Sequence, residues 1–151
     1  MTLETTDQLR EIMSERRECL GQICELGRRQ LELIAQSELG TLLRVLSVKQ
    51  RLLSHLQSVE RRLDPFRDQA PESRQWRTAA ERDQCARLAS DCQRLLMEIV
   101  QQERQSEREM IEHREDAAAG LRGAHVAAQA RGAYSADSGT LSGHLDLSCE
   151  Q

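Results

Sequence analysis

The chain has 151 residues, of which 38% are hydrophobic and 30% charged, and its formal net charge is −4. The length suits one domain. Only Phe66, Trp76 and Tyr134 are aromatic, which argues against a compact globule or a β-sandwich, since aromatic rings supply much of the buried area in such cores. No run approaches the ~18 apolar residues of a membrane span. Basic and acidic residues are interleaved, without the basic block of a nucleic-acid-binding arm. We therefore expect neither membrane insertion nor nucleic-acid binding.

Three sets of apolar residues recur at steps of three and four or at sums of these steps, and they are the main evidence for the fold. The first set is Leu9, Ile12, Cys19, Ile23, Leu26 and Leu33; the second is Leu39, Leu42, Leu46, Leu53, Leu56 and Leu63; the third is Cys85, Leu88, Cys92, Leu95, Ile99 and Met110. Since an α-helix turns every 3.6 residues, each set lies on one side of a helix, where another helix must cover it. The pattern predicts an all-α fold, an elongated antiparallel three-helix bundle or coiled coil with a flexible C-terminal tail.

The first helix is expected to follow a cap at Thr5 or Thr6 and to run to about Gln36. Ser37 is a suitable N-cap for a second helix, and this favours a break or sharp kink there. One long helix with a bend is the alternative.

The second helix is expected over 38–63. Apolar residues flank its main stripe, which predicts that both other helices cover it and that it is central to the bundle. Lys49, the only lysine of the chain, is assigned to its polar side.

A loop is expected over 64–73, because Pro65 disfavours helical geometry at the residue before it. Phe66 is predicted to pin this loop against the end of the bundle. Ser73 could cap the third helix, which should begin at 73–77 and extend at least to Glu115.

The C-terminal part changes in composition. We expect the bundle domain to span 1–118, a marginal Ala-rich helix to span 119–134, and 135–151 to be disordered. Apolar side chains that lack a partner inside the chain commonly mark an interaction site. The candidate partner-binding residues are Met110, Ile111, Leu121, Val126 and Tyr134.

Enzymatic patterns are weak or missing, so the chain is predicted not to be an enzyme. No strand is evident to carry a glycine-rich phosphate loop, and the Glu112–His113 pair is not an HExxH zinc motif. The five cysteines form no CxxC pair and no zinc-like spacing with histidine. Their odd number, with no secretory signal over 1–10, argues against a disulfide framework and for a cytoplasmic protein. No metal or cofactor is expected.

The stretch from Leu39 to Phe66 resembles the FlgN-type flagellar export chaperones. In that family a second helix carries a Lys-Gln-x-Leu-Leu-x-x-Leu pattern, which Lys49, Gln50, Leu52, Leu53 and Leu56 match here. The similarity in layout covers about residues 5–134, although its specific part is short.

The resemblance implies a cytosolic chaperone that holds hook-associated proteins and presents them to the flagellar type III export gate. The client would supply an amphipathic terminal helix, and Tyr134 lies where the family has a tyrosine that docks on the gate protein FlhA. The alternative, which the heptads fit equally well, is a structural coiled-coil or adaptor protein that associates with itself.

Overall fold

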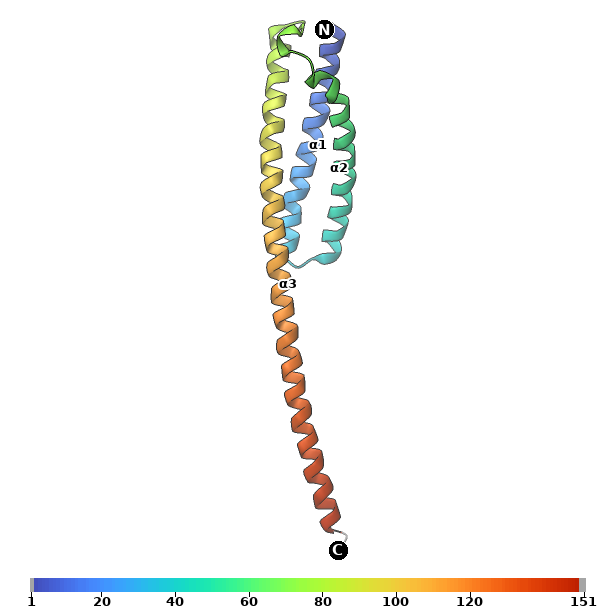
Figure 1. Cartoon of the computed structure of the whole chain (residues 1–151), viewed down its shortest axis with the longest axis vertical. Helices are drawn as coiled ribbons and strands as arrows, with labels where there is room; N and C mark the ends of the chain where they lie inside the picture. Colours follow the sequence, from blue (N-terminus) through green and yellow to red (C-terminus); the bar gives the residue numbers. More distant parts are fainter. Residues whose placement is uncertain (1, 150–151) are drawn as a thin grey trace. The chain divides into compact units, whose positions relative to one another are not determined.

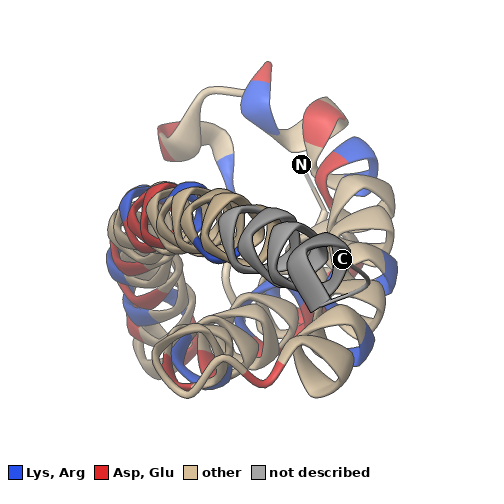
Figure 2. Ribbon diagram, turned by 90° about the horizontal axis from the view of Figure 1, so that it is seen from below, with Lys and Arg blue, Asp and Glu red and all other residues tan. Residues whose placement is uncertain are grey.

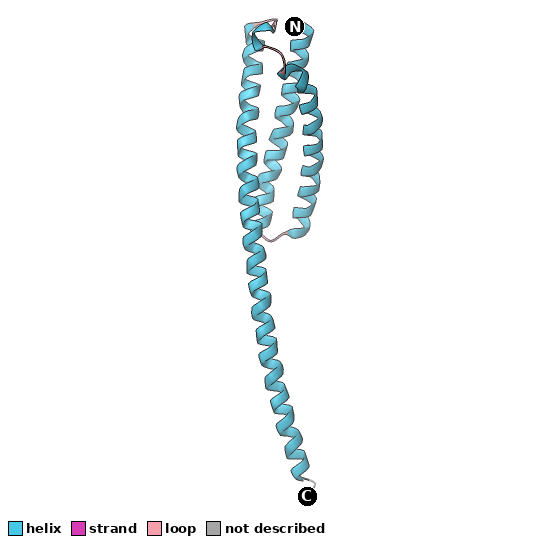
Figure 3. Ribbon diagram, viewed as in Figure 1, coloured by secondary structure: helices cyan, strands magenta, loops and turns pink. Residues whose placement is uncertain are grey.

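The structure is a computed structural model that describes the backbone of residues 2–149 and the side chains of residues 2–136. It contains the helices α1 (Leu3–Ala35), α2 (Leu39–Arg67) and α3 (Ala79–Cys149), with a short 3-10 turn, η1 (Pro71–Ser73), between α2 and α3. Figure 3 shows helices and loops only, and no strand occurs over 2–149. The chain divides into two compact units, Met1–Glu109 and Met110–Gln151.

In the first unit, α1, α2 and the first part of α3 lie side by side as an antiparallel three-helix bundle (Figure 1). The predicted all-α fold is confirmed. The boundaries predicted at 118 and 134 stay predictions. The disorder predicted for 135–151 falls mainly on residues 137–151, whose side chains lie outside the described part of the chain, and it too stays a prediction.

The core of the bundle is divided into two apolar clusters. The larger one joins Leu9, Ile12, Met13 and Leu20 of α1, Val59, Leu63 and Phe66 of α2, and Cys85 and Cys92 of α3. The smaller one lies by the α1–α2 turn and consists of Leu33, Ile34 and Leu42 with Val45 packed against them. Cys19, Cys85 and Cys92 are buried as predicted, and burial raises the pKa of each of these thiols above its ordinary value.

The most covered helix is α1, so the prediction that α2 occupies the centre of the bundle is wrong. Twelve residues of α1 are buried against five of α2. The buried seam of α2 consists of two sets of residues at seven-residue spacing, and all eight are buried or half-buried. The first set is 42, 49, 56 and 63, and the second is 45, 52, 59 and 66. Leu39 and Leu46, two members of the predicted stripe, are exposed because they lie beside this seam.

Helix ends differ from the expected ones because other side chains cap them. Thr2 caps α1, its hydroxyl oxygen accepting a hydrogen bond from the Thr5 N–H at 3.3 Å. Thr6 is buried, with its hydroxyl 2.7 Å from the carbonyl oxygen of Gln75. At the start of α3 the cap is Thr78, which accepts from the Glu81 N–H at 3.1 Å, and not Ser73.

The predicted break between α1 and α2 is confirmed, but Ser37 does not cap α2. Ser37 has a φ of 56° and terminates α1 in the left-handed conformation. The Glu38 N–H donates to Leu33 C=O at 3.0 Å and the Ser37 N–H to Ile34 C=O at 3.1 Å. This pair of bonds is a Schellman motif, which satisfies the last carbonyls of α1.

The expected loop over 64–73 is also corrected, since α2 continues through Pro65 to Arg67. Pro65 lies in the last turns of α2 and has no N–H, so the helix lacks one hydrogen bond there, from residue 65 to the carbonyl oxygen of Arg61. Phe66 is buried in the larger cluster, and this burial fixes the final turn of α2. Phe66 thus pins the end of the bundle as predicted, from within the helix.

Candidate functional site

The predicted partner-binding residues lie on α3 in the second unit, and all five are exposed. Over 110–136, which we call the C-terminal segment, every side chain is exposed except the half-buried Ala118. Leu121 exposes 73% of its surface and Val126 exposes 63%. The segment therefore presents large apolar side chains at its surface, as the sequence predicted.

The five residues do not share one face of the helix. At about 100° per residue, Met110 and Leu121 lie within about 20° of each other, whereas Ile111, Val126 and Tyr134 are turned from Met110 by about 100° or more. Three alanines complete the face that Met110 and Leu121 mark. This face, the Met110–Leu121 face, consists of Met110, Ala117, Leu121, Ala124 and Ala128, all exposed. Its small side chains leave room for another helix to approach closely.

The residues that carry the FlgN resemblance lie in the bundle. Lys49 is buried, Leu52, Leu53 and Leu56 are half-buried, and Gln50 is exposed. The pattern therefore describes mainly how α2 packs.

Lys49 lies in a polar layer between the two apolar clusters, which contradicts its assignment to a polar outer face. Its ammonium group donates to Gln30 Oε1 at 3.0 Å and pairs with the carboxylate of Glu103. Gln30 Nε2 in turn donates to Ser106 Oγ at 2.6 Å. Lys49, Gln30 and Ser106 are all buried, and each comes from a different helix. Such a layer fixes the register of a bundle, because a shift of any helix would leave its polar groups unpaired.

One turn along α1 from Gln30, the side chain of Gln102 packs directly on Gly27. Gln102 Nε2 donates to the carbonyl oxygen of Cys24 at 3.0 Å, and a Cβ atom at residue 27 would overlap the Gln102 amide. Gly27 therefore allows the side chain of Gln102 on α3 to lie directly against the backbone of α1.

An ion-pair cluster joins α1 to the end of α2. Arg16 Nε lies 2.5 Å from Glu60 Oε1, and Arg67 contacts the other oxygen of Glu60. Burial raises the pKa of the Glu60 carboxyl, but the hydrogen bonds and charges of Arg16 and Arg67 outweigh burial, and the pKa falls below its ordinary value of 4.5.

This cluster predicts a pH-dependent effect of Glu60→Gln. Because the folded pKa is depressed, the carboxylate contributes stability above its unfolded pKa, and that contribution is lost as pH falls through the folded pKa. We expect the substitution to cost about 1 kcal/mol at pH 7 and less at pH 3. Urea unfolding at both pH values measures the difference. An equal cost at both values would mean that the effect is packing and not charge.

Across the described residues no group of His, Cys, Asp and Glu could hold a metal ion. Nor does any helix in this part of the chain have the length and apolar content needed to cross a membrane. Basic and acidic residues are interspersed along the helices (Figure 2). In the comparisons with known proteins, no family model, no curated protein and no solved structure matched the chain.

Proposed function

We propose that this chain is a cytoplasmic chaperone that binds an amphipathic helix of another protein on its C-terminal segment. The observation that carries the proposal is the exposed Met110–Leu121 face, an apolar stripe at helical spacing. A helix in water gains most of its stability from packing of its apolar face. A client helix laid on this face would supply that packing and would itself be protected from self-assembly.

In its specific form, the proposal follows the FlgN resemblance. The clients are then flagellar hook-associated proteins, and the complex is delivered to the export gate protein FlhA. Binding through one narrow stripe with a single large central side chain, Leu121, gives modest affinity, and modest affinity permits release at the gate.

Leu121→Asp is expected to weaken client capture at least tenfold, because it places a carboxylate at the centre of the apolar stripe. Binding of a fluorescently labelled terminal helix of a hook-associated protein, followed by anisotropy, measures the change. The matched control is Ala119→Asp, which adds the same charge about 160° around the helix and should bind normally. Equal binding by both variants and the parent chain would refute capture on this face.

Tyr134→Ala is expected to leave folding and client binding intact while weakening docking on FlhA. The tyrosine is 78% exposed, so its removal leaves no cavity in the bundle. Pull-down of purified FlhA cytoplasmic domain by client-loaded chaperone tests the assignment. A large fall in the melting temperature of Tyr134→Ala would instead show that the ring has a packing role.

A second candidate function, self-association, is favoured by a different surface. Leu39, Leu43 and Leu46 lie at i, i+4 and i+7 on α2 and are 63%, 68% and 37% exposed. They form a second apolar stripe beside the buried seam. If this stripe joins two copies of the chain, light scattering will show a dimer that Leu43→Asp dissociates. A monomer at all concentrations would exclude this function.

A further inference from the structure

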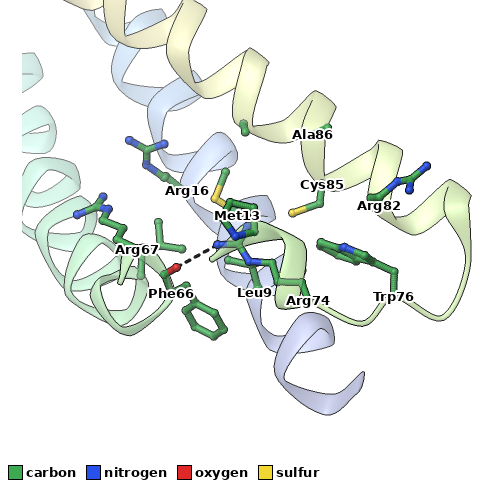
Figure 4. A pocket seen from close by; sticks show the side chains of 13 residues that line it. Leu9, Met13, Arg16, Phe66, Arg67, Arg74, Trp76, Arg82, Cys85 and Ala86 are labelled. Carbon is green, nitrogen blue, oxygen red and sulfur yellow. Dashed lines mark hydrogen bonds between the residues drawn. The ribbon is translucent and has the colours of Figure 1, made fainter. Parts of the chain in front are cut away.

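A pocket of about 370 Å³ opens at the end of the bundle that holds Phe66. Its walls come from α1, the last turns of α2, the connection between α2 and α3, and the first turns of α3 (Figure 4). The apolar part of the lining includes Leu9, Met13, Leu63, Phe66, Trp76 and Cys85. The size and the apolar walls are typical of a site for a small organic molecule.

The charged part of the lining has one sign. Arg16, Arg67, Arg74 and Arg82 line the pocket, and no Asp or Glu does. The guanidinium groups of Arg16 and Arg67 share the carboxylate of Glu60, and Arg82 Nε lies 3.8 Å from Asp83 Oδ1. Both carboxylates lie outside the lining. Among the described residues, three of the four arginines are therefore paired with a carboxylate, and Arg74 is the cation of the lining that remains to attract an anion.

Arg74 is the one arginine of the lining that has no acidic partner among the described residues. No ion pair to Arg74 is found among the described residues, although 15 such pairs are present in that part of the chain. Its Nη2 donates to the carbonyl oxygen of Phe66 at 3.0 Å, while its Nε is buried without an acceptor. A buried donor without an acceptor is unfavourable. The Nη1 group of Arg74 is not among the buried unsatisfied atoms and has no hydrogen bond within the described residues, so this end of the guanidinium is the one that a ligand oxygen could reach.

We propose that this pocket binds a small carboxylic acid with an apolar body. The guanidinium of Arg74 offers a planar set of donors that matches the two oxygens of a carboxylate. Phe66, Trp76 and Met13 would cover an alkyl or aryl body. A purely apolar ligand would leave the Arg74 guanidinium without a counter-ion, and a strongly hydrated inorganic anion would not use the apolar walls. The proposal is independent of the helix-binding role, since every lining residue belongs to the first unit.

The chain carries its own reporter, because Trp76, its only tryptophan, lines the pocket. Decanoate, below its micelle-forming concentration, is expected to change the Trp76 fluorescence in a saturable way. Decanol tests the carboxylate, since it keeps the apolar body and removes the charge, and decylammonium reverses the charge. We expect both to bind at least tenfold more weakly than decanoate. Equal binding of decanol and decanoate would overturn the proposal.

Arg74→Gln should weaken decanoate binding about tenfold. Arg74→Lys keeps the charge without the planar fork, so its affinity for decanoate should lie between those of the parent chain and Arg74→Gln. The matched control is Arg104→Gln, which neutralises an exposed arginine of α3 outside the pocket and should bind decanoate normally. Circular dichroism confirms that each variant is folded. Folded Arg74→Gln that binds decanoate as the parent chain does would refute the assignment of Arg74. Binding of client helices is measured in parallel, so that a failure of either proposal is seen separately.

Discussion

Val59→Asp is expected to unfold the three-helix bundle. Val59 is 0% exposed and lies in the larger apolar cluster. The substitution removes about 1.5–3 kcal/mol of apolar burial and places a carboxylate where no donor is provided, a further cost of several kcal/mol. A loss of more than about 4 kcal/mol approaches the whole stability of a small domain. The helical signal at 222 nm at 25 °C measures the outcome.

The matched control for Val59→Asp lies on the same helix. Leu39→Asp makes a comparable change at the first residue of α2, where the leucine is 63% exposed. A carboxylate there lies near the positive end of the helix dipole, so we expect a change of less than about 0.5 kcal/mol. If Leu39→Asp were the more damaging of the two, then the seam assigned to α2 would be wrong.

The contrast between Val59 and Leu39 concerns a feature that the sequence did not determine, namely which apolar residues of α2 are buried. The heptad pattern predicted the three helices and the buried cysteines, and Ser37 predicted the break after α1, because 3.6-residue periodicity and turn chemistry are local properties. In α2, however, two apolar stripes run side by side, one through Leu39 and Leu46 and one through Val59 and Phe66. Periodicity cannot choose between them, since the choice depends on which side α1 and α3 cover.

The candidate sites likewise include features that local sequence could predict and features that depend on contacts between distant residues. Exposure of Leu121 and Val126 could be predicted, because their surroundings are Ala-rich and offer no partner. The arginine-lined pocket could not, because it brings together side chains from Leu9 to Ala89 that no local pattern connects. The buried Lys49 was missed for the same reason: its partners Gln30 and Glu103 lie 19 and 54 residues away. A lysine at a heptad position between Leu42 and Leu56 was the one available signal.

Lys49→Glu is expected to cost more than about 3 kcal/mol. The substitution places a second carboxylate beside Glu103 and opposite the amide oxygen of Gln30, at a position where the lysine side chain is buried. Removing one partner of a buried pair typically costs about 3–5 kcal/mol, because the remaining charge is left uncompensated. Here Glu103 is half-exposed, so water moderates its part of the penalty, and the new carboxylate bears most of it. Urea denaturation gives the free energy of unfolding.

Three further variants separate charge from packing at this layer. Arg51→Glu reverses an exposed cation of the same helix and should cost less than about 0.5 kcal/mol. Lys49→Met keeps the side-chain volume but leaves Gln30 Oε1 without its donor, so we expect a cost of about 1–3 kcal/mol. Adding Glu103→Lys to Lys49→Glu restores an opposite pair and should recover part of the loss. If Lys49→Glu were as mild as Arg51→Glu, the lysine would be solvated and the two apolar clusters would not be joined by a polar layer. If it is severe and the swap rescues it, the ion pair between residues 49 and 103 is a main contribution of this layer to the stability of the bundle.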